Sequence, residues 1–238
     1  DIRYINCLSR NNGDGLGANA GEGLQHNLRC YYINCITAGN NFAGFHAYGG
    51  TAEYFYTNVV ATENRDGNFH LGPDGWQDKT RVVVHVRNSV GCRPDSGKRF
   101  HKANLVTTYI KGSSFRLDSD YNYWGAELTA TPKFCYWDAY AGPAPYARAY
   151  PYAEGPGSVT GDWYLLDEDG HLHCDGHSLA GVSGPPGFVS EREHDYHLTA
   201  DSVLRGRGCD LSRKPWYLPE MGLDRDNRER KIWNIGAY

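Results

Sequence analysis

Tyr32-Ile33-Asn34-Cys35 is one of four related stretches in this chain of 238 residues. The other three are Tyr4-Ile5-Asn6-Cys7, Tyr56-Thr57-Asn58-Val59 and Val86-Arg87-Asn88-Ser89. The four asparagines are separated by 28, 24 and 30 residues, and six residues after them stand the turn formers Asn12, Asn40, Asn64 and Pro94. Periods of about 20 to 50 residues are typical of repeat architectures. The chain is therefore predicted to consist of stacked repeats.

A row of apolar residues follows each asparagine at a spacing of ten to twelve residues: Leu16, Phe45, Phe69 and Phe100. Strands this short, with turns this frequent, bury an apolar face only by stacking on copies of themselves. Equivalent residues of a β-solenoid lie ~4.8 Å apart, so we expect this row to form an apolar stack inside it. We also expect the asparagines at 6, 34, 58 and 88 to form a ladder of side-chain amides that bond from one repeat to the next.

The composition agrees with an all-β protein. Gly 29 and Tyr 18 against a single Met favour strands and turns over helices. Lys+Arg 24 against Asp+Glu 28 give a net charge of -4 without a basic run, which argues against a nonspecific nucleic-acid binder. No stretch reaches the ~18 consecutive apolar residues of a membrane span.

Three later motifs add a resemblance to a known family. Residues 119–124 read SDYNYW, residues 175–179 read DGHSL, and the chain ends with Ile235-Gly236-Ala237-Tyr238 after the turn 224–230. These motifs and the repeats resemble right-handed parallel β-helix proteins secreted by bacteria, which include polysaccharide lyases and phage tailspikes. Asn227 stands where the family turn has glycine, a tolerable change because asparagine also adopts the left-handed conformation.

The resemblance implies an all-β fold, a right-handed parallel β-helix (solenoid) with a long irregular excursion and a C-terminal cap. Residues 1–125 are predicted to be the stacked coils, and residues 126–170 the Pro/Gly/Tyr-rich excursion. Residues 171–238 would form the terminal coils and the cap of what is one domain overall. Such motifs are structural and name no reaction.

A row of histidines is the sharpest candidate site. His46, His70 and His101 each follow a phenylalanine of the apolar row, so strand alternation predicts that they point outward in one column. Asn68 and Arg99 would lie beside them. In a β-elimination on a uronate, Arg99 would neutralise the carboxylate and His70 or His101 would remove the proton. His46, Asn68, Lys98 and Lys102 would bind the polymer, but stacking of like side chains in a solenoid explains the same row without catalysis.

Two metal sites are weaker candidates. Asp14, Asp66 and Asp95 precede the apolar row, and two of them could form the carboxylate pair that glycoside hydrolysis needs. Asp66 and Asp95 could also bind calcium. Aspartate in such turns, however, usually bonds its own backbone. His171, His173, Asp175 and His177 form a cluster with metal-ligand composition. The resemblance assigns Asp175 and His177 to a structural element instead. No cofactor other than calcium is suggested.

The cysteines and the first repeat carry two further expectations. Seven cysteines without a CxxC pair favour buried free thiols with at most one or two bridges. Cys7 and Cys35 should occupy equivalent positions on adjacent repeats. The chain enters its first repeat within three residues of Asp1, so we expect preceding polypeptide or another protein chain to stack on this end.

These observations support two hypotheses. The first is a secreted or cell-surface β-helix that binds an extracellular polysaccharide and, if it is an enzyme, cleaves it as a polysaccharide lyase or a glycoside hydrolase. The alternative is a noncatalytic structural or adhesive module of a larger extracellular assembly. Unsaturated ends released from uronate polymers would distinguish the two.

Overall fold

The structure is a computed structural model that describes most of the chain. The described residues are 1–19, 28–48, 51–65, 67–71, 81–93, 105–109, 114–125, 133–138, 147–151, 163–164, 177–180 and 186–238.

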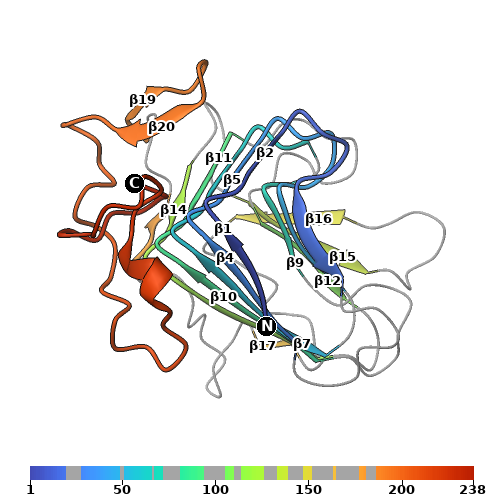
Figure 1. Ribbon diagram of the computed structural model, residues 1–238. Helices are drawn as coiled ribbons and strands as arrows, with labels where there is room; N and C mark the ends of the chain where they lie inside the picture. The colour runs from blue at the N-terminus through green and yellow to red at the C-terminus, as the bar shows by residue number, and fades with distance from the viewer. Residues whose placement is uncertain are drawn as a thin grey trace.

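Three six-stranded sheets form the body of the molecule (Figure 1). Sheet A contains β1 (Ile2–Ile5), β4 (Leu28–Ile33), β7 (Ala52–Thr57), β10 (Arg81–Arg87), β13 (Ser114–Asp120) and β17 (Trp163–Tyr164). Sheet B contains β2 (Leu8–Arg10), β5 (Ile36–Ala38), β8 (Val60–Thr62), β11 (Val90–Cys92), β14 (Tyr123–Trp124) and β18 (Leu179–Ala180). Sheet C contains β3 (Leu16–Asn19), β6 (Phe45–Tyr48), β9 (Phe69–Leu71), β12 (Leu105–Tyr109), β15 (Lys133–Asp138) and β16 (Ala147–Pro151).

From β1 to β12 the chain visits the three sheets in turn, so each of these strands pairs with the third strand further along the sequence. Ile5 pairs with Ile33, Leu8 with Ile36 and Leu16 with Phe45, all in parallel. We call β1–β3 repeat 1, β4–β6 repeat 2, β7–β9 repeat 3 and β10–β12 repeat 4. The prediction of stacked parallel strands in an all-β chain is confirmed, and the helix of the described part is the short 3₁₀ segment Pro219–Gly222.

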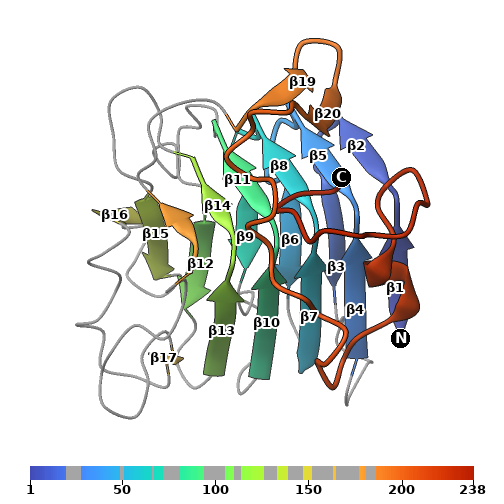
Figure 2. The ribbon, with the colours of Figure 1, turned by 90° about the vertical axis from the view of Figure 1, so that its left-hand side faces the viewer.

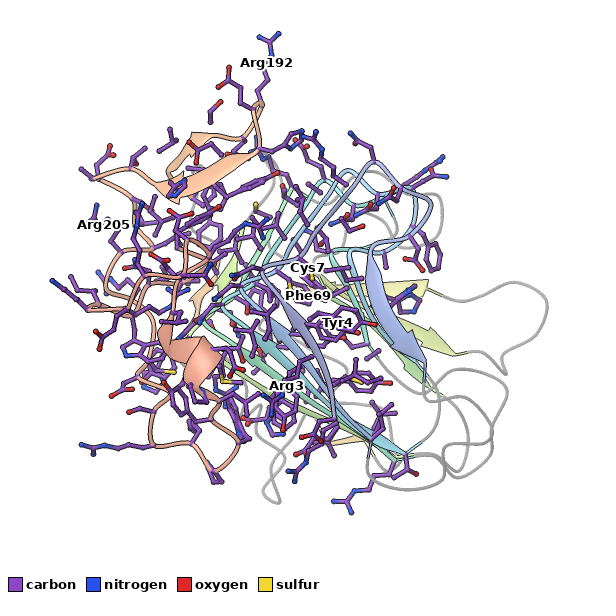
Figure 3. The ribbon with its side chains drawn as sticks, in the orientation of Figure 1. Arg3, Tyr4, Cys7, Phe69, Arg192 and Arg205 are labelled. Carbon is purple, nitrogen blue, oxygen red and sulfur yellow. The ribbon has the colours of Figure 1, made fainter. Side chains whose placement is uncertain are left out.

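One apolar core is shared by the three sheets (Figure 3). Sheet A contributes a stack of tyrosines, with ring centroids 4.9 Å apart for Tyr4 and Tyr32 and 4.7 Å apart for Tyr32 and Tyr56. Phe45 and Phe69 face them from sheet C as a second stack, 5.3 Å apart. Both phenylalanines are fully buried, as the repeat predicted.

The predicted register fails in repeat 4. Leu105, and not Phe100, pairs with Phe69 in sheet C. Repeat 4 is therefore longer between sheets B and C than the earlier repeats. The spacing of ten to twelve residues after the asparagine, counted from Asn88, placed the sheet C strand of this repeat too early in the sequence. Phe100 itself lies outside the described residues.

Asparagines turn the chain from sheet A to sheet B. Asn6, Asn34, Asn58 and Asn88 all have left-handed backbones, with φ between 51° and 56°. Asparagine adopts this conformation more readily than other residues with a side chain, which explains why it recurs at this corner. Tyr121 holds the same place after β13, with φ 56°.

Side-chain amides bond between repeats in a different row from the predicted one. The corner asparagines are aligned, but their side chains bond the C-terminal part of the chain: Asn6 to Asn227, Asn34 to Leu223, Asn58 to Met221 and Asn88 to Cys209. An amide hydrogen bond between repeats lies in the second turn row instead, where Asn40 Nδ2 donates to Asn64 Oδ1 at 2.9 Å, and Asn64 Nδ2 donates to Asn68 Oδ1 of the same repeat at 2.9 Å. Asn40 and Asn64 are buried, and they also donate to the carbonyls of Ser9 and Thr37, so their polar groups are satisfied within the protein.

The C-terminal segment lies along the corner between sheets A and B. After the hairpin β19 (Phe188–Ser190) and β20 (Asp195–Leu198), residues 204–238 cross the repeats from repeat 4 to repeat 1 and return (Figure 2). We call residues 204–238 the strap. Met221 packs on Tyr31, Ile33 and Phe55 of sheet A, while Leu204 and Ile235 pack on sheet B.

The described parts of residues 126–170 are strands. Of these, β15 and β16 extend sheet C as an antiparallel pair, and β17 adds to sheet A. The boundaries at residues 125 and 170 stay predictions. The described residues include no helix with the length and apolar character needed to cross a membrane.

Candidate functional site

The predicted histidine column exists but is buried. His46 and His70 pair in register on β6 and β9, and each side chain is about 1% exposed. Their rings lie under Phe42, with centroids 5.0 Å and 5.8 Å from its ring. The predicted contact of His46 and His70 with a polymer is therefore wrong, because a phenylalanine of the preceding turn covers the outer face of sheet C here.

The buried histidines form a hydrogen-bonded chain. His46 Nδ1 lies 3.0 Å from the half-exposed carboxylate of Asp14, and His46 Nε2 lies 3.2 Å from His70 Nδ1. With Asp14 accepting from Nδ1, Nε2 of a neutral His46 accepts from His70. This chain gives both ring nitrogens of buried His46, and Nδ1 of buried His70, a hydrogen-bond partner.

The other predicted members of that face are placed elsewhere or outside the described residues. Val106, rather than His101, pairs with His70, so the prediction that His101 continues the column in repeat 4 was wrong. Asn68 is fully buried and donates to the Cys92 carbonyl at 2.8 Å, so it is not a surface ligand. Lys98, Arg99, His101 and Lys102 lie outside the described residues.

The metal candidates are only partly placed. Asp14 bonds the amide of Gly15 as well as His46, which agrees with the turn-forming role. His177 bonds Asp120 at 2.8 Å and stacks on Tyr121, and Ser178 accepts from the Asn122 amide. Asp66, Asp95, His171, His173 and Asp175 lie outside the described residues. Within the described ranges no group of three or more His, Cys, Asp or Glu side chains is arranged so that it could hold a metal ion.

The structure brings together a charged network on the outer face of sheet A that the sequence reasoning missed. His85 on β10 lies between two carboxylates, with Nδ1 2.8 Å from Asp118 Oδ2 and Nε2 3.1 Å from Glu53 Oε1. Each carboxylate has an arginine as well: Arg29 Nε donates to Glu53 at 3.0 Å, and Arg87 bonds Asp118. Each ring nitrogen of His85 therefore lies within hydrogen-bond distance of a carboxylate oxygen.

Asp118 is held ionised by this network. Burial raises the pKa of its carboxyl, but the hydrogen bond from His85 and the charge and hydrogen bond of Arg87 outweigh burial and leave the pKa well below its usual range. The carboxylate is thus a fixed negative charge at the end of the network.

Aromatic rings pack against His85 of the network. Tyr31, Phe55 and His85 occupy one row across β4, β7 and β10, with Tyr31 and Phe55 4.6 Å apart and Phe55 and His85 4.7 Å apart, nearly parallel. Trp216 of the strap contacts both Phe55 and His85, at 5.2 Å and 5.6 Å between ring centroids.

A groove of about 560 Å³ adjoins the network at the start of the sheet A strands. Its charged walls are Arg29 of β4, Glu53 of β7 and Arg81 of β10, together with Asp1. Arg29 and Glu53 pair in register across adjacent strands, and Val83 takes the next place in the same row. The groove therefore crosses the strands in the direction in which the repeats stack.

The repeat itself contained the signal for this network. Counting three residues back from the corner asparagines gives Arg3, Tyr31, Phe55 and His85, and three back from Tyr121 gives Asp118. Glu53 lies five residues before Asn58. The pairing of β10 with β7 and β13 brings these residues into contact.

No protein-family profile, curated protein or solved structure matches this chain.

Proposed function

We propose that this chain is a right-handed parallel β-helix that binds an extracellular polysaccharide on the outer face of sheet A. The strand order, in which each strand from β1 to β12 pairs with the third one further along the chain, supports the solenoid. The family resemblance of the repeats and of residues 119–124, 175–179 and 235–238 supports the handedness and a secreted or cell-surface location. The histidine face of sheet C is set aside as the binding surface because it is buried.

The groove along Arg29, Glu53 and Arg81 carries this proposal. A groove that crosses parallel strands suits an extended polymer, because equivalent side chains recur at the ~4.8 Å strand spacing along it. Trp216, which is only partly buried, supplies a ring against which the apolar face of a sugar packs, whereas Tyr31 and Phe55 are buried beneath the strap.

The charged side chains of the groove indicate which class of polysaccharide it binds. Arg29 is half-exposed on the groove wall and Arg81 is exposed, and both guanidinium groups are suited to a carboxylate. Arg29 already binds one carboxylate within the protein, that of Glu53. The substrate class is therefore an acidic polysaccharide, whose uronate groups bind the two arginines.

Cleavage would use the same groups. In a β-elimination, an arginine neutralises the uronate carboxylate, a base removes the proton from the adjacent carbon, and the glycosidic oxygen leaves. Arg29 and Glu53 are the candidates for these two roles among the described residues, because His70 is buried, while Arg99 and His101 lie outside the described residues.

Binding to a polyuronate, compared with a neutral glucan, tests the proposal by calorimetry. Replacing Arg29 or Arg81 by Ala should weaken polyuronate binding about tenfold each, the expected effect of losing one charge-assisted hydrogen bond. Arg205→Ala is the matched control, since Arg205 is an exposed arginine on the far side of the strap (Figure 3). Equal affinity of all variants, or no binding by the unmodified protein, would refute the proposal.

Ultraviolet absorbance of unsaturated ends, recorded in the same mixtures with and without calcium, tests cleavage. Absorbance that Glu53→Gln abolishes assigns the base. Binding without absorbance leaves a polysaccharide-binding protein that is not a lyase.

One observation favours the second candidate function, a noncatalytic module of a larger assembly. β1, β2 and β3 are edge strands of their three sheets, and no described strand pairs with their outer sides. Unpaired parallel edges accept further strands. Concentration-dependent association without glycan binding would support this candidate.

A further inference from the structure

The first two repeats place a pair of free thiols side by side at the corner of the stack. Cys7 and Cys35 each follow a corner asparagine directly. The flanking pairs Ile5 with Ile33 and Leu8 with Ile36 put them in equivalent positions, and the Ile36 amide donates to the Cys7 carbonyl at 2.9 Å. The predicted equivalence is thus confirmed, and both residues are free cysteines.

The thiols share one orientation and point into the same space. Cys7 Sγ lies 3.5 Å from the Ile5 carbonyl oxygen, and Cys35 Sγ lies 3.4 Å from the corresponding oxygen of Ile33. Cys35 Sγ also lies 3.3 Å from the Tyr4 carbonyl oxygen, so it leans toward repeat 1. Residues paired in register on parallel strands have Cα atoms ~4.8 Å apart, within the ~4.4 to 6.8 Å that a disulfide needs.

We propose that Cys7 and Cys35 are an oxidation site that forms a disulfide between repeat 1 and repeat 2. The bond joins the edge repeat, which has a described neighbour on one side only, to the rest of the stack. It closes the loop that contains residues 8–34 and so limits fraying at this edge.

The two thiols have different roles in the reaction. Cys7 is half-buried, whereas Cys35 is fully buried. Burial, the largest influence, raises the pKa of Cys35 to about 12, so at neutral pH Cys35 is almost entirely a thiol. Cys7 therefore reacts first with an external oxidant, and Cys35 reacts second.

With glutathione disulfide as the oxidant, the steps balance. The Cys7 thiolate attacks one sulfur of glutathione disulfide, a Cys7–glutathione bond forms, and one glutathione thiolate leaves and takes up the proton that Cys7 lost. Cys35 then loses its proton and attacks the Cys7 sulfur, which releases a second glutathione thiolate to take up that proton. Two protein thiols are oxidised and one glutathione disulfide is reduced to two glutathione molecules.

Mass spectrometry of the folded protein after treatment with glutathione disulfide tests the site. The expected result is a cross-linked peptide that contains Cys7 and Cys35 and has lost two hydrogen atoms. Cys35→Ser should retain glutathione on Cys7, and Cys7→Ser should leave Cys35 unmodified. Cys30→Ser is the matched control, since Cys30 is a buried thiol of repeat 2 whose loss should leave the cross-link intact.

Thermal unfolding supplies a second readout that does not depend on the variants. The oxidised protein should unfold at a Tm several degrees higher than the reduced protein, and dithiothreitol should reverse the increase. The proposal is overturned if both thiols remain free after oxidation, or if either pairs with another cysteine. It is also overturned if glutathione stays on Cys7 in the protein without substitutions.

Discussion

Single asparagines turn the chain from sheet A to sheet B, because asparagine tolerates the left-handed backbone conformation that this corner needs. The left-handed corner at Asn58 needs a residue that tolerates positive φ, and the buried side chain then donates to the Met221 carbonyl at 3.1 Å. One asparagine thus turns the chain between sheets and also attaches the strap.

The two roles of Asn58 can be separated by two substitutions. Asn58→Ala loses the hydrogen bond and forces alanine into the left-handed region, and each change should cost about 1 kcal/mol of the free energy of unfolding. Asn58→Gly loses the same hydrogen bond but has no Cβ penalty, so it should be about 1 kcal/mol more stable than Asn58→Ala. Urea unfolding of the two variants measures this difference, and equal midpoints would contradict the backbone role.

At the scale of elements, the hairpin β19–β20 is joined to the strap by one titrating side chain. His197 of β20 contacts Asp195 on its own strand, Asp226 of the strap at 3.0 Å, and the ring of Tyr238 at 3.8 Å between centroids. Burial lowers the pKa of His197, but hydrogen bonds to Asp226 and Asp195 outweigh it and raise the pKa above its usual value. The charged imidazole therefore holds the hairpin against the strap.

The attachment of this hairpin should depend on pH. A raised pKa in the folded state means that His197 contributes its full stabilisation below about pH 6.5, the usual histidine value, and loses it as the pH rises through the folded-state pKa. Amide hydrogen exchange in residues 188–198, corrected for its intrinsic pH dependence, should accelerate across that range.

Replacing His197 by Gln should remove this pH dependence. His194→Gln is the matched control on the same hairpin, since its ring faces Tyr196 and no carboxylate of the strap. An unchanged pH profile in His197→Gln would show that another group attaches the hairpin.

At the scale of the whole molecule, the stack is more strongly held in its middle than at its first repeat. β7 pairs with both β4 and β10, whereas β1 pairs with β4 alone. The strap crosses repeats 1 to 4, but its contact with repeat 1 includes exposed polar bonds such as Arg3 to Glu220 and Asn6 to Asn227. The first repeat is therefore more open to solvent and to another strand than the described parts of repeats 2 and 3.

Amide hydrogen exchange should report this gradient. Amides of β7 are expected to exchange only by global unfolding, whereas those of β1 should exchange at least tenfold faster by local opening. Raising the protein concentration should slow β1 exchange if another copy stacks on this edge, and should leave it unchanged if the edge stays free. Equal protection of β1 and β7 at low concentration would show that the edge is covered.

The sequence by itself determined the repeat, because its causes are local. A left-handed asparagine, a short strand on each side and an apolar residue at a constant offset are properties of a few neighbouring residues, and they predicted the stacked parallel strands and the buried Phe45 and Phe69. The offset failed for Phe100, where a longer repeat moved the strand to Leu105.

Only the tertiary structure decided which faces are open. Phe42 covers His46 and His70, the strap packs over Tyr31, Ile33 and Phe55 of sheet A and over sheet B, and Glu53, His85 and Asp118 meet across three strands. Each contact joins residues that are not sequence neighbours, and strand alternation assigns a side chain to a face without saying what packs over that face. The candidate site therefore moved from the predicted histidines to a groove in sheet A.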